Sequence, residues 1–341
     1  MKAVGLNRYL PITDLESLRD LELLRPEPEE RDLLVRVEAI SVNPVDTKIR
    51  RSKGTDHHED LPQVLGWDAA GVVEAVGSKA TLFQSGNEVY YAGSITRPGA
   101  NSEYHLVDER IVAIKPRCLD MAHASALPLT AITAYEALFN RMGISIGGDS
   151  EGKTILIIGG AGGVGSVAIQ IAKIANLRVI ATASRPETQA WCRTMGADEV
   201  IDHTKSLPDQ LQRLNYATVD YILNNSSTEQ HWAAMCEVIK PQGFICCIVD
   251  TIEAVDLNAL KRKSIIFAWE FMFTRSMYQT DDMIEQHKLL TRVAHWVDAG
   301  MIQSTLTETL SPINAANLRI AHARVESGRM IGKLVLTGWH S

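Results

Sequence analysis

The sequence predicts an α/β protein of two domains, in which a small β-rich domain accompanies a doubly wound domain with a parallel sheet. Before about residue 125, short strand-like runs alternate with turns, a pattern typical of a β-rich domain. From residue 126 onward, strand patterns alternate with helical patterns, which indicates a parallel sheet covered by helices. The length of 341 residues exceeds the usual size of a single core and agrees with two domains.

The expected elements follow in order along the chain. Strands of the first part are expected at residues 33–40, 71–76, 88–91 and 111–114. A helix is expected within 127–143, and strands of the second part at 154–158, 178–183, 199–201, 219–223 and 244–249. An apolar run at 264–273, a helical segment at 281–299 and a short strand at 333–336 complete the chain.

A glycine-rich stretch follows the strand expected at 154–158. Gly160, Gly162 and Gly165 have the spacing G-x-G-x-x-G between a β-branched run and a helical pattern. The first glycine permits a tight turn, the second lets the backbone approach a pyrophosphate, and the third lets helix and strand pack closely. Backbone N–H groups of the loop and of the first helical turn, including Gly163 and Val164, would then face the phosphates.

Two other interpretations of this stretch are weaker. Glycine-rich turns also occur for packing alone, but the apolar run at 178–183 closes a strand-helix-strand unit of the expected size. A transmembrane helix is disfavoured because five glycines cluster in the middle of the segment. The stretch therefore predicts a dinucleotide site.

The residues after the second strand of this unit predict which dinucleotide binds. NAD sites place an Asp or Glu about twenty residues beyond the glycines, where it accepts bonds from the ribose hydroxyls. Here the strand is followed by Ser184 and Arg185, and the first carboxylate is Glu187. A hydroxyl and a guanidinium fork suit a 2′-phosphate, so NADPH is expected. The alternative is that Arg185 is merely solvated.

Composition excludes several classes of partner. The net charge of −7 provides no basic surface for nucleic acid, and no segment reads as a membrane span. The first residues lack the apolar core of a signal peptide, so a cytoplasmic location is expected. The five cysteines form no C-x-x-C pair, and adjacent Cys246 and Cys247 fit an apolar strand better than a redox pair.

Several further motifs resemble one family. They are VNPVDT at 42–47, GWDAAG at 66–71, LPLTAITAY at 127–135, GAD at 196–198 and GKLVL at 332–336. Together with the glycine loop, they make the chain similar to the medium-chain dehydrogenase/reductase superfamily. Within it the chain resembles the zeta-crystallin-like quinone oxidoreductases, and among these the zinc-type alcohol dehydrogenase-like subgroup. The resemblance implies a GroES-like catalytic domain at 1–125 and 275–341, a Rossmann NADP-binding domain at 126–274, and often a dimer.

The chain departs from the zinc enzymes of this superfamily. Those enzymes have a Cys at the place of Asn43 and a His-Glu pair at the place of Trp67 and Asp68. Their third thiolate falls within 127–130, where no Cys occurs, and the segment 91–107 lacks the cysteines of a structural zinc lobe. Because a zinc site needs three or four ligands, no metal is expected. Zinc held by His57, His58 or His123 stays open as an alternative.

Without a Lewis acid, oxidation of a simple alcohol lacks stabilisation of the alkoxide. A quinone or an α,β-unsaturated carbonyl accepts hydride at carbon and places the charge on oxygen, where hydrogen-bond donors suffice. The expected function is therefore NADPH-dependent, zinc-independent reduction of a quinone or enone. A non-catalytic NADPH-binding protein is the alternative from a different class, as among the crystallin relatives.

The resemblance also implies roles for individual residues. Asn43 stands where the zinc thiolate would be and is expected to donate to a substrate oxygen. Asp46 is expected either to relay protons or to cap the helical turn that follows it. Thr130 and Thr133 match residues near the nicotinamide, so Thr133 is expected to act in catalysis and Thr130 to contact the cofactor.

Three more cofactor contacts complete the prediction. Ligands of a doubly wound sheet bind at the carboxyl ends of its strands, which here are followed by Asn225 and Val249. Lys333 matches a family lysine that reaches the cofactor from the C-terminal segment.

The apolar run at 264–273, if it forms an exposed sheet edge, predicts that a second copy covers it in a homodimer.

Overall fold

The computed structural model describes residues 1–339, which divide into two compact units. The first unit comprises Met1–Leu129, Phe273–Gly300 and the chain from Ser304 onward, and the second comprises Thr130–Met272 with Met301–Gln303. The sequence-based boundaries at 125/126 and 274/275 lie a few residues from these. The short excursion at 301–303 was not expected. Gln303 joins the second unit there because its backbone N–H donates to Gln170 Oε1 at 2.8 Å.

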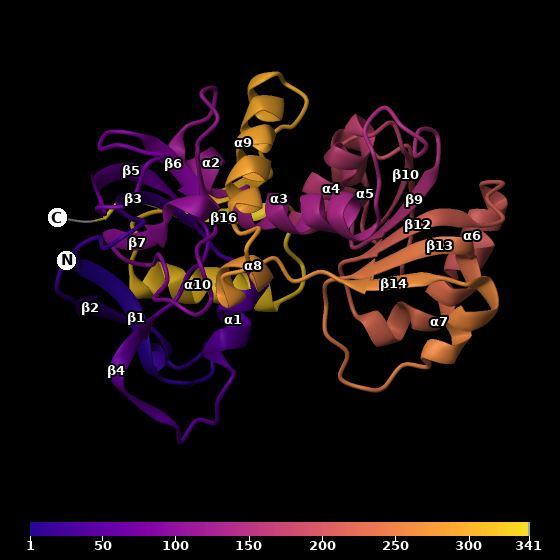
Figure 1. Ribbon diagram of the computed structural model, residues 1–341. Coiled ribbons are helices and arrows are strands. Elements are labelled where there is room, and N and C mark those ends of the chain that lie inside the picture. The colour runs from indigo at the N-terminus through magenta and orange to yellow at the C-terminus, as the bar shows by residue number, and fades with distance from the viewer. Residues whose placement is uncertain (340–341) are drawn as a thin grey trace. The chain divides into compact units, whose positions relative to one another are not determined.

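The second unit is built on a six-stranded sheet in which every pairing is parallel (Figure 1). The strand order is β11-β10-β9-β12-β13-β14, so the chain winds outward from β9 in both directions. This order confirms the doubly wound sheet predicted from the alternating pattern. The strands are β9 (Thr154–Ile158), β10 (Arg178–Thr182), β11 (Glu199–Ile201), β12 (Val219–Asn224), β13 (Ile239–Cys247) and β14 (Ile266–Trp269).

Helices cover both faces of this sheet. Right-handed crossovers that run in opposite directions from β9 place α4 and α7 on opposite faces, as Figure 1 shows. Branched apolar side chains such as Leu156, Ile222 and Ile245 are buried beneath the helices. The helices are α4 (Gly163–Ile174), α5 (Pro186–Thr194), α6 (Leu207–Arg213) and α7 (Thr228–Val238), with a 3₁₀ helix at Leu257–Lys263.

The first unit contains two sheets whose pairings are antiparallel except between β15 and β16. The larger sheet has the order β15-β16-β3-β5-β6-β8, with β7 also paired to β3, and the smaller has the order β2-β1-β4. This is the β-rich, GroES-like domain that the sequence predicts. The strands are β1 (Lys2–Arg8), β2 (Arg19–Glu22), β3 (Asp32–Ser41), β4 (His58–Val64), β5 (Ala69–Val76), β6 (Glu88–Tyr91), β7 (Tyr104–Asp108), β8 (Val112–Ile114), β15 (Leu306–Leu310) and β16 (Lys333–Thr337).

Helices of the first unit are mostly short. They are α1 (Pro44–Arg50), α2 (Met121–Ser125), α8 (Thr274–Tyr278), α9 (Ile284–Asp298) and α10 (Ala315–Glu326), with 3₁₀ turns at Leu15–Ser17 and Glu109–Ile111. Helix α3 (Pro128–Tyr135) crosses from one unit to the other and continues as a π-helix at Glu136–Arg141. In the part of the chain described, no helix combines the length and the apolar character needed to span a bilayer.

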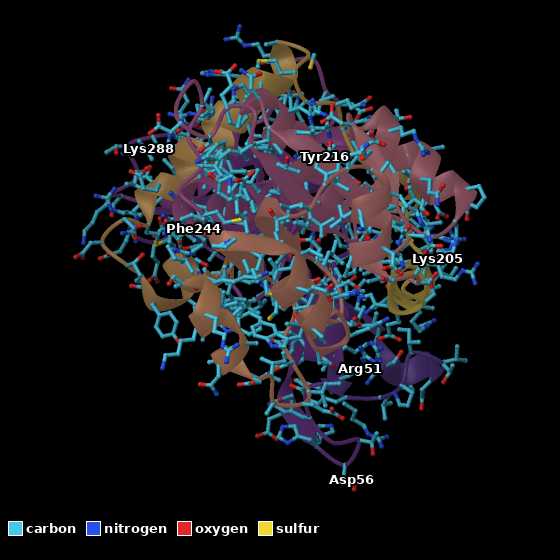
Figure 2. The ribbon with its side chains drawn as sticks, turned by 90° about the vertical axis from the view of Figure 1, so that its right-hand side faces the viewer. Arg51, Asp56, Lys205, Tyr216, Phe244 and Lys288 are labelled. Carbon is cyan, nitrogen blue, oxygen red and sulfur yellow. The ribbon has the colours of Figure 1, made fainter. Side chains whose placement is uncertain are left out.

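The segment 51–60 is polar and mostly exposed, and its last residues belong to a strand. Its exposed tip carries Asp56, which Figure 2 labels at the end of the segment that begins with Arg51. From His58 onward the chain forms β4, which pairs with β1. The segment is exposed but ends in regular structure.

Candidate active site and nucleotide site

Three strand ends meet at one place in the larger sheet of the first unit. Because β3 pairs with β5 on one side and with β16 on the other, its C-terminal end lies beside the starts of both neighbours. Asn43 follows β3, Asp68 immediately precedes β5, and Lys333 begins β16. The backbone fixes this meeting, since Ser41 N–H donates to Asp68 O at 3.0 Å.

The side chains of these three residues form one buried polar cluster. Lys333 Nζ donates to Asn43 Oδ1, to Asp68 Oδ2 at 3.1 Å and to Val42 O at 3.2 Å. Asn43 Nδ2 donates to Asp68 Oδ2 at 2.9 Å, and Asp68 Oδ1 accepts the Leu129 backbone N–H at 2.9 Å. Burial raises the pKa of Asp68, while the Lys333 ammonium opposes this shift.

Asp46 extends the cluster along α1. Asn43 is the N-cap residue of this helix, and Asp46, three residues on, accepts the Asn43 backbone N–H on Oδ2 at 2.5 Å. This is the reciprocal half of a capping box, so Asp46 supports the start of the helix from inside it. Burial raises the pKa of Asp46 to about 7, against the bond from Asn43 and the charge of Lys333. Near neutral pH the side chain therefore exists in both protonation states.

Trp67 stands where the family resemblance implies a zinc histidine. Its indole is buried, donates to Ser94 O at 2.9 Å and packs edge-to-face on Phe273. Over residues 1–339, no three His, Cys, Asp or Glu side chains gather as a metal site would require. His57 instead contacts Glu59, and His123 Nδ1 lies 2.8 Å from Asp120.

In the second unit, the glycine loop joins β9 to α4 at the carboxyl edge of the sheet. Close packing within the protein explains why two of its residues are glycine. A Cβ on Gly165 would lie 2.3 Å from Gly159 O, and one on Gly160 would lie 2.8 Å from the Ala181 Cβ. Both distances are shorter than real contacts, so helix, strand and turn pack this closely only with glycine.

Packing within the protein does not require a glycine at position 162. A Cβ there would meet only Gly159 O, at an ordinary 3.6 Å, and its backbone is in an extended conformation open to any residue. As N-cap of α4, Gly162 stands where the unbonded N–H groups and the positive end of the helix face outward. A bare backbone at this position fits the close approach of a pyrophosphate.

The expected ligand residues of the second unit converge on this loop. Gly160 N–H donates to Thr182 O at 3.0 Å, which places the following Ser184 and Arg185 at the same edge. Asn225 N–H donates to Ile158 O at 3.1 Å, and its side chain faces Gly159. Both polar atoms of the Asn225 side chain are buried without a hydrogen-bond partner in the protein. A buried amide without partners costs stability, and a bound nucleotide would supply them.

The remaining predicted residues are placed as follows. Arg185 is half-buried at the N-cap of α5, and its guanidinium lies 3.1 Å from Glu187, the first carboxylate after the strand. Val249 O accepts the Thr228 hydroxyl at 2.6 Å beyond the end of β13. Thr130 and Thr133 are buried one turn apart on α3, and the i, i+3 spacing puts them on one face of that helix.

Sequence reasoning assigned no role to a buried charged cluster in the second unit. Arg141 Nε donates to Glu270 at 2.8 Å, and Arg141 also lies 3.7 Å from Glu136. Glu136 and Glu270 are buried, and burial together with the Glu136 carboxylate raises the pKa of Glu270 well above its ordinary value. Its only sequence signal was the charge of two glutamates within otherwise apolar segments.

Two family profiles match the chain. One, described as "Zinc-binding dehydrogenase", matches residues 195–336, and the other, "Alcohol dehydrogenase GroES-like domain", matches residues 29–117. A zinc-type alcohol dehydrogenase-like protein of Staphylococcus aureus is 46% identical over 98% of this chain and 99% of its own length. The 2-methylene-furan-3-one reductase of Solanum lycopersicum is 41% identical over 54% of this chain and 49% of its own length.

Solved structures show the same likeness. A putative zinc-dependent alcohol dehydrogenase of Rhizobium etli is 52% identical, with a TM-score of 0.95 over 100% of this chain and 99% of that chain. The quinone oxidoreductase of Escherichia coli, solved with NADPH, is 23% identical with a TM-score of 0.82 over 99% of this chain and 100% of that chain, which shows a shared fold. The chain thus belongs to the medium-chain dehydrogenase/reductase superfamily, in its quinone oxidoreductase-like branch, with zinc-type alcohol dehydrogenase-like proteins as its relatives.

Proposed function

We propose that this oxidoreductase transfers hydride from NADPH to a quinone or an α,β-unsaturated carbonyl without zinc. The observation that carries the proposal is the Lys333 ammonium, bonded to both Asn43 and Asp68. By the family resemblance, Asn43 stands where the zinc enzymes have a cysteine ligand, and Asp68 stands where they have the glutamate that follows a histidine. A fixed ammonium there competes electrostatically with a metal cation and supplies a positive charge of its own.

The proposed chemistry assigns separate tasks to the two units. NADPH, when bound, would supply a hydride for the electron-poor carbon of the acceptor, and the electron pair of the conjugated system would then place negative charge on the acceptor oxygen. Asn43 donates a hydrogen bond to that oxygen. Asp46, with its pKa near neutrality, holds the proton that completes the reduction, and Thr133 contributes a hydroxyl beside the reacting groups.

The cofactor is proposed to bind along the carboxyl edge of the second unit. Backbone N–H groups of the glycine loop, including those of Gly163 and Val164, hold the pyrophosphate. Asn225, Val249 and Thr130 contact the rest of the dinucleotide. The contact of Lys333 with the cofactor, expected from the family resemblance, is not part of this proposal, because in this structure its three N–H groups donate within the first unit.

The nature of the acceptor is supported by the relatives. A 2-methylene-furan-3-one is an alkene conjugated to a ketone, and the tomato reductase of this compound is similar to about half of this chain. The Escherichia coli neighbour is a quinone oxidoreductase. In both acceptors the negative charge develops on an oxygen, and an amide N–H can donate a hydrogen bond to that oxygen.

The test is NADPH oxidation by chelator-treated protein, with an ortho-quinone and a conjugated enone as parallel acceptors. We expect turnover with at least one of them, unchanged when zinc is added. Activity that appeared only with zinc would favour the alternative metal enzyme. Tight NADPH binding with no turnover of either acceptor would favour the non-catalytic alternative.

Preference for NADPH over NADH gives a second prediction. Arg185→Ala is expected to raise the NADPH dissociation constant about tenfold and to leave that of NADH nearly unchanged, because a charge-assisted bond to the 2′-phosphate is lost. Glu187→Gln, which releases Arg185 from its ion pair, should tighten NADPH binding. Titration of cofactor fluorescence measures both, with exposed Arg193→Ala on the same helix as control. Equal losses for NADH and NADPH would contradict the assignment.

The homodimer also stays a prediction. Strand β14 is an edge of its sheet and leaves Ile266 and Trp269 about half exposed, at 50% and 47%. Unpaired edge strands with apolar side chains favour pairing with another chain. The mass of the protein in solution decides between a monomer and a dimer.

A further inference from the structure

A buried ion pair fixes both ends of the Asn43 side chain. An ammonium only donates hydrogen bonds and a carboxylate only accepts them. Because Lys333 and Asp68 flank the amide, Oδ1 must face Lys333 and Nδ2 must face Asp68. The charges thus leave the Asn43 amide a single orientation.

Stability alone does not account for this pair. Lys333 is 4% exposed and Asp68 is fully buried, and desolvation of two charges cancels most of their attraction. Apolar side chains of similar size would serve equally well at the junction of β3, β5 and β16. All three N–H groups of the Lys333 ammonium are used within the protein, since they donate to Val42, Asn43 and Asp68.

One hydrogen of the Asn43 amide is weakly used. Its Nδ2 carries two hydrogens, of which one bonds Asp68 at 2.9 Å while the other points to Ser41 O at a long 3.4 Å. The ammonium on Oδ1 withdraws electron density through the amide and makes both N–H groups stronger donors. A strengthened donor suits an oxygen that becomes negatively charged.

We propose that Lys333 and Asp68 are positioning residues that orient and polarise Asn43 for an acceptor oxyanion. Lys333 acts through the amide and does not touch the substrate. Its positive charge thereby favours the acceptor oxyanion without a metal ion. This role rests on the proposed function, and it differs from a contact between Lys333 and the cofactor.

A double-mutant cycle tests the coupling. Lys333→Met keeps the length of the side chain and removes its charge, and Asn43→Ala removes the amide. We expect Lys333→Met to lower kcat by about ten- to a hundredfold, less than loss of a whole oxyanion donor. It should leave the NADPH dissociation constant within about threefold and have little further effect in the Asn43→Ala background. Asp68→Asn serves as a second variant if Lys333→Met does not fold.

Lys115→Met is the matched control. Lys115 is the other buried lysine of the first unit, bonded to Leu119 O at 2.7 Å and paired with Glu88. Its replacement should leave kcat unchanged. Multiplicative effects of Lys333→Met and Asn43→Ala would overturn the proposal. So would a raised NADPH dissociation constant with unchanged kcat, which would make Lys333 a cofactor ligand.

Binding of substituted phenols tests the same point without turnover. Phenolates of similar shape and different basicity mimic the oxyanion, and their absorbance reports binding in the presence of NADP⁺. Affinity should rise with basicity in the parent protein and should depend on it less in Lys333→Met. No phenolate binding, or equal slopes, overturns the proposal. A parent that binds phenolates with the expected slope but reduces neither quinone nor enone instead contradicts only the proposed function.

Discussion

Replacing Gly162 by Ala should leave the folded protein nearly as stable as the parent and weaken NADPH binding more than tenfold. The new methyl group meets only Gly159 O at 3.6 Å, so the loss of unfolding free energy should be about 1 kcal/mol or less. The same methyl would occupy the space into which the pyrophosphate is proposed to come. Urea unfolding and NADPH titration measure the two effects separately.

Gly165→Ala, three residues on, is the matched comparison. Its methyl would lie 2.3 Å from Gly159 O and 2.7 Å from Gly160 Cα, so backbone must move. The cost of such overpacking is expected at about 1–3 kcal/mol or more, whether or not NADPH is present. If Gly162→Ala bound NADPH as the parent does, the pyrophosphate would not lie against this residue. Equal stability losses for the two variants would show that the loop is shaped only by packing.

Glu270→Gln should become increasingly more stable than the parent as the pH rises. In the folded protein, burial and the Glu136 carboxylate raise the pKa of Glu270 to about 9, while the unfolded chain ionises near pH 4.3. The folded state therefore holds the extra proton, and the parent loses this contribution to stability as the pH rises from about 4.3 through 9. Glutamine does not ionise, so the difference should grow by at most about 1.4 kcal/mol per pH unit.

The measurement is urea unfolding of both proteins at pH 5.5, 7 and 8.5. Glu253→Gln, at an exposed position of the same unit, should show no pH-dependent difference from the parent. Arg141→Met should lower stability further at alkaline pH, because its guanidinium faces both carboxylates. A constant difference between Glu270→Gln and the parent across this range would mean that Glu270 is ionised throughout.

The sheet of the second unit and the glycine loop could be predicted from the sequence because they depend on local patterns. Runs of branched apolar residues such as Thr154–Ile158 suit strands buried on both faces, and the helical patterns between them require parallel pairing. The packing role of Gly165 also follows from spacing alone, whereas the tight turn predicted at Gly160 falls one residue earlier, at Gly159, whose φ is +77°. The polar segment 51–60 was harder, because β4 carries few apolar residues and forms by pairing with β1.

Tertiary structure determined which charged side chains are buried together. Lys333 is 290 residues from Asn43 and 265 from Asp68, and no local pattern connects them. The register of β16, β3 and β5 brings them together and excludes water, which turns three ordinary polar residues into a fixed cluster. The same holds for Glu136 and Glu270, whose proton is retained because the fold buries two carboxylates beside one arginine. The sequence by itself therefore determined the glycine loop and the parallel sheet that carries it, while long-range strand pairing decided which charged side chains are buried together beside Asn43.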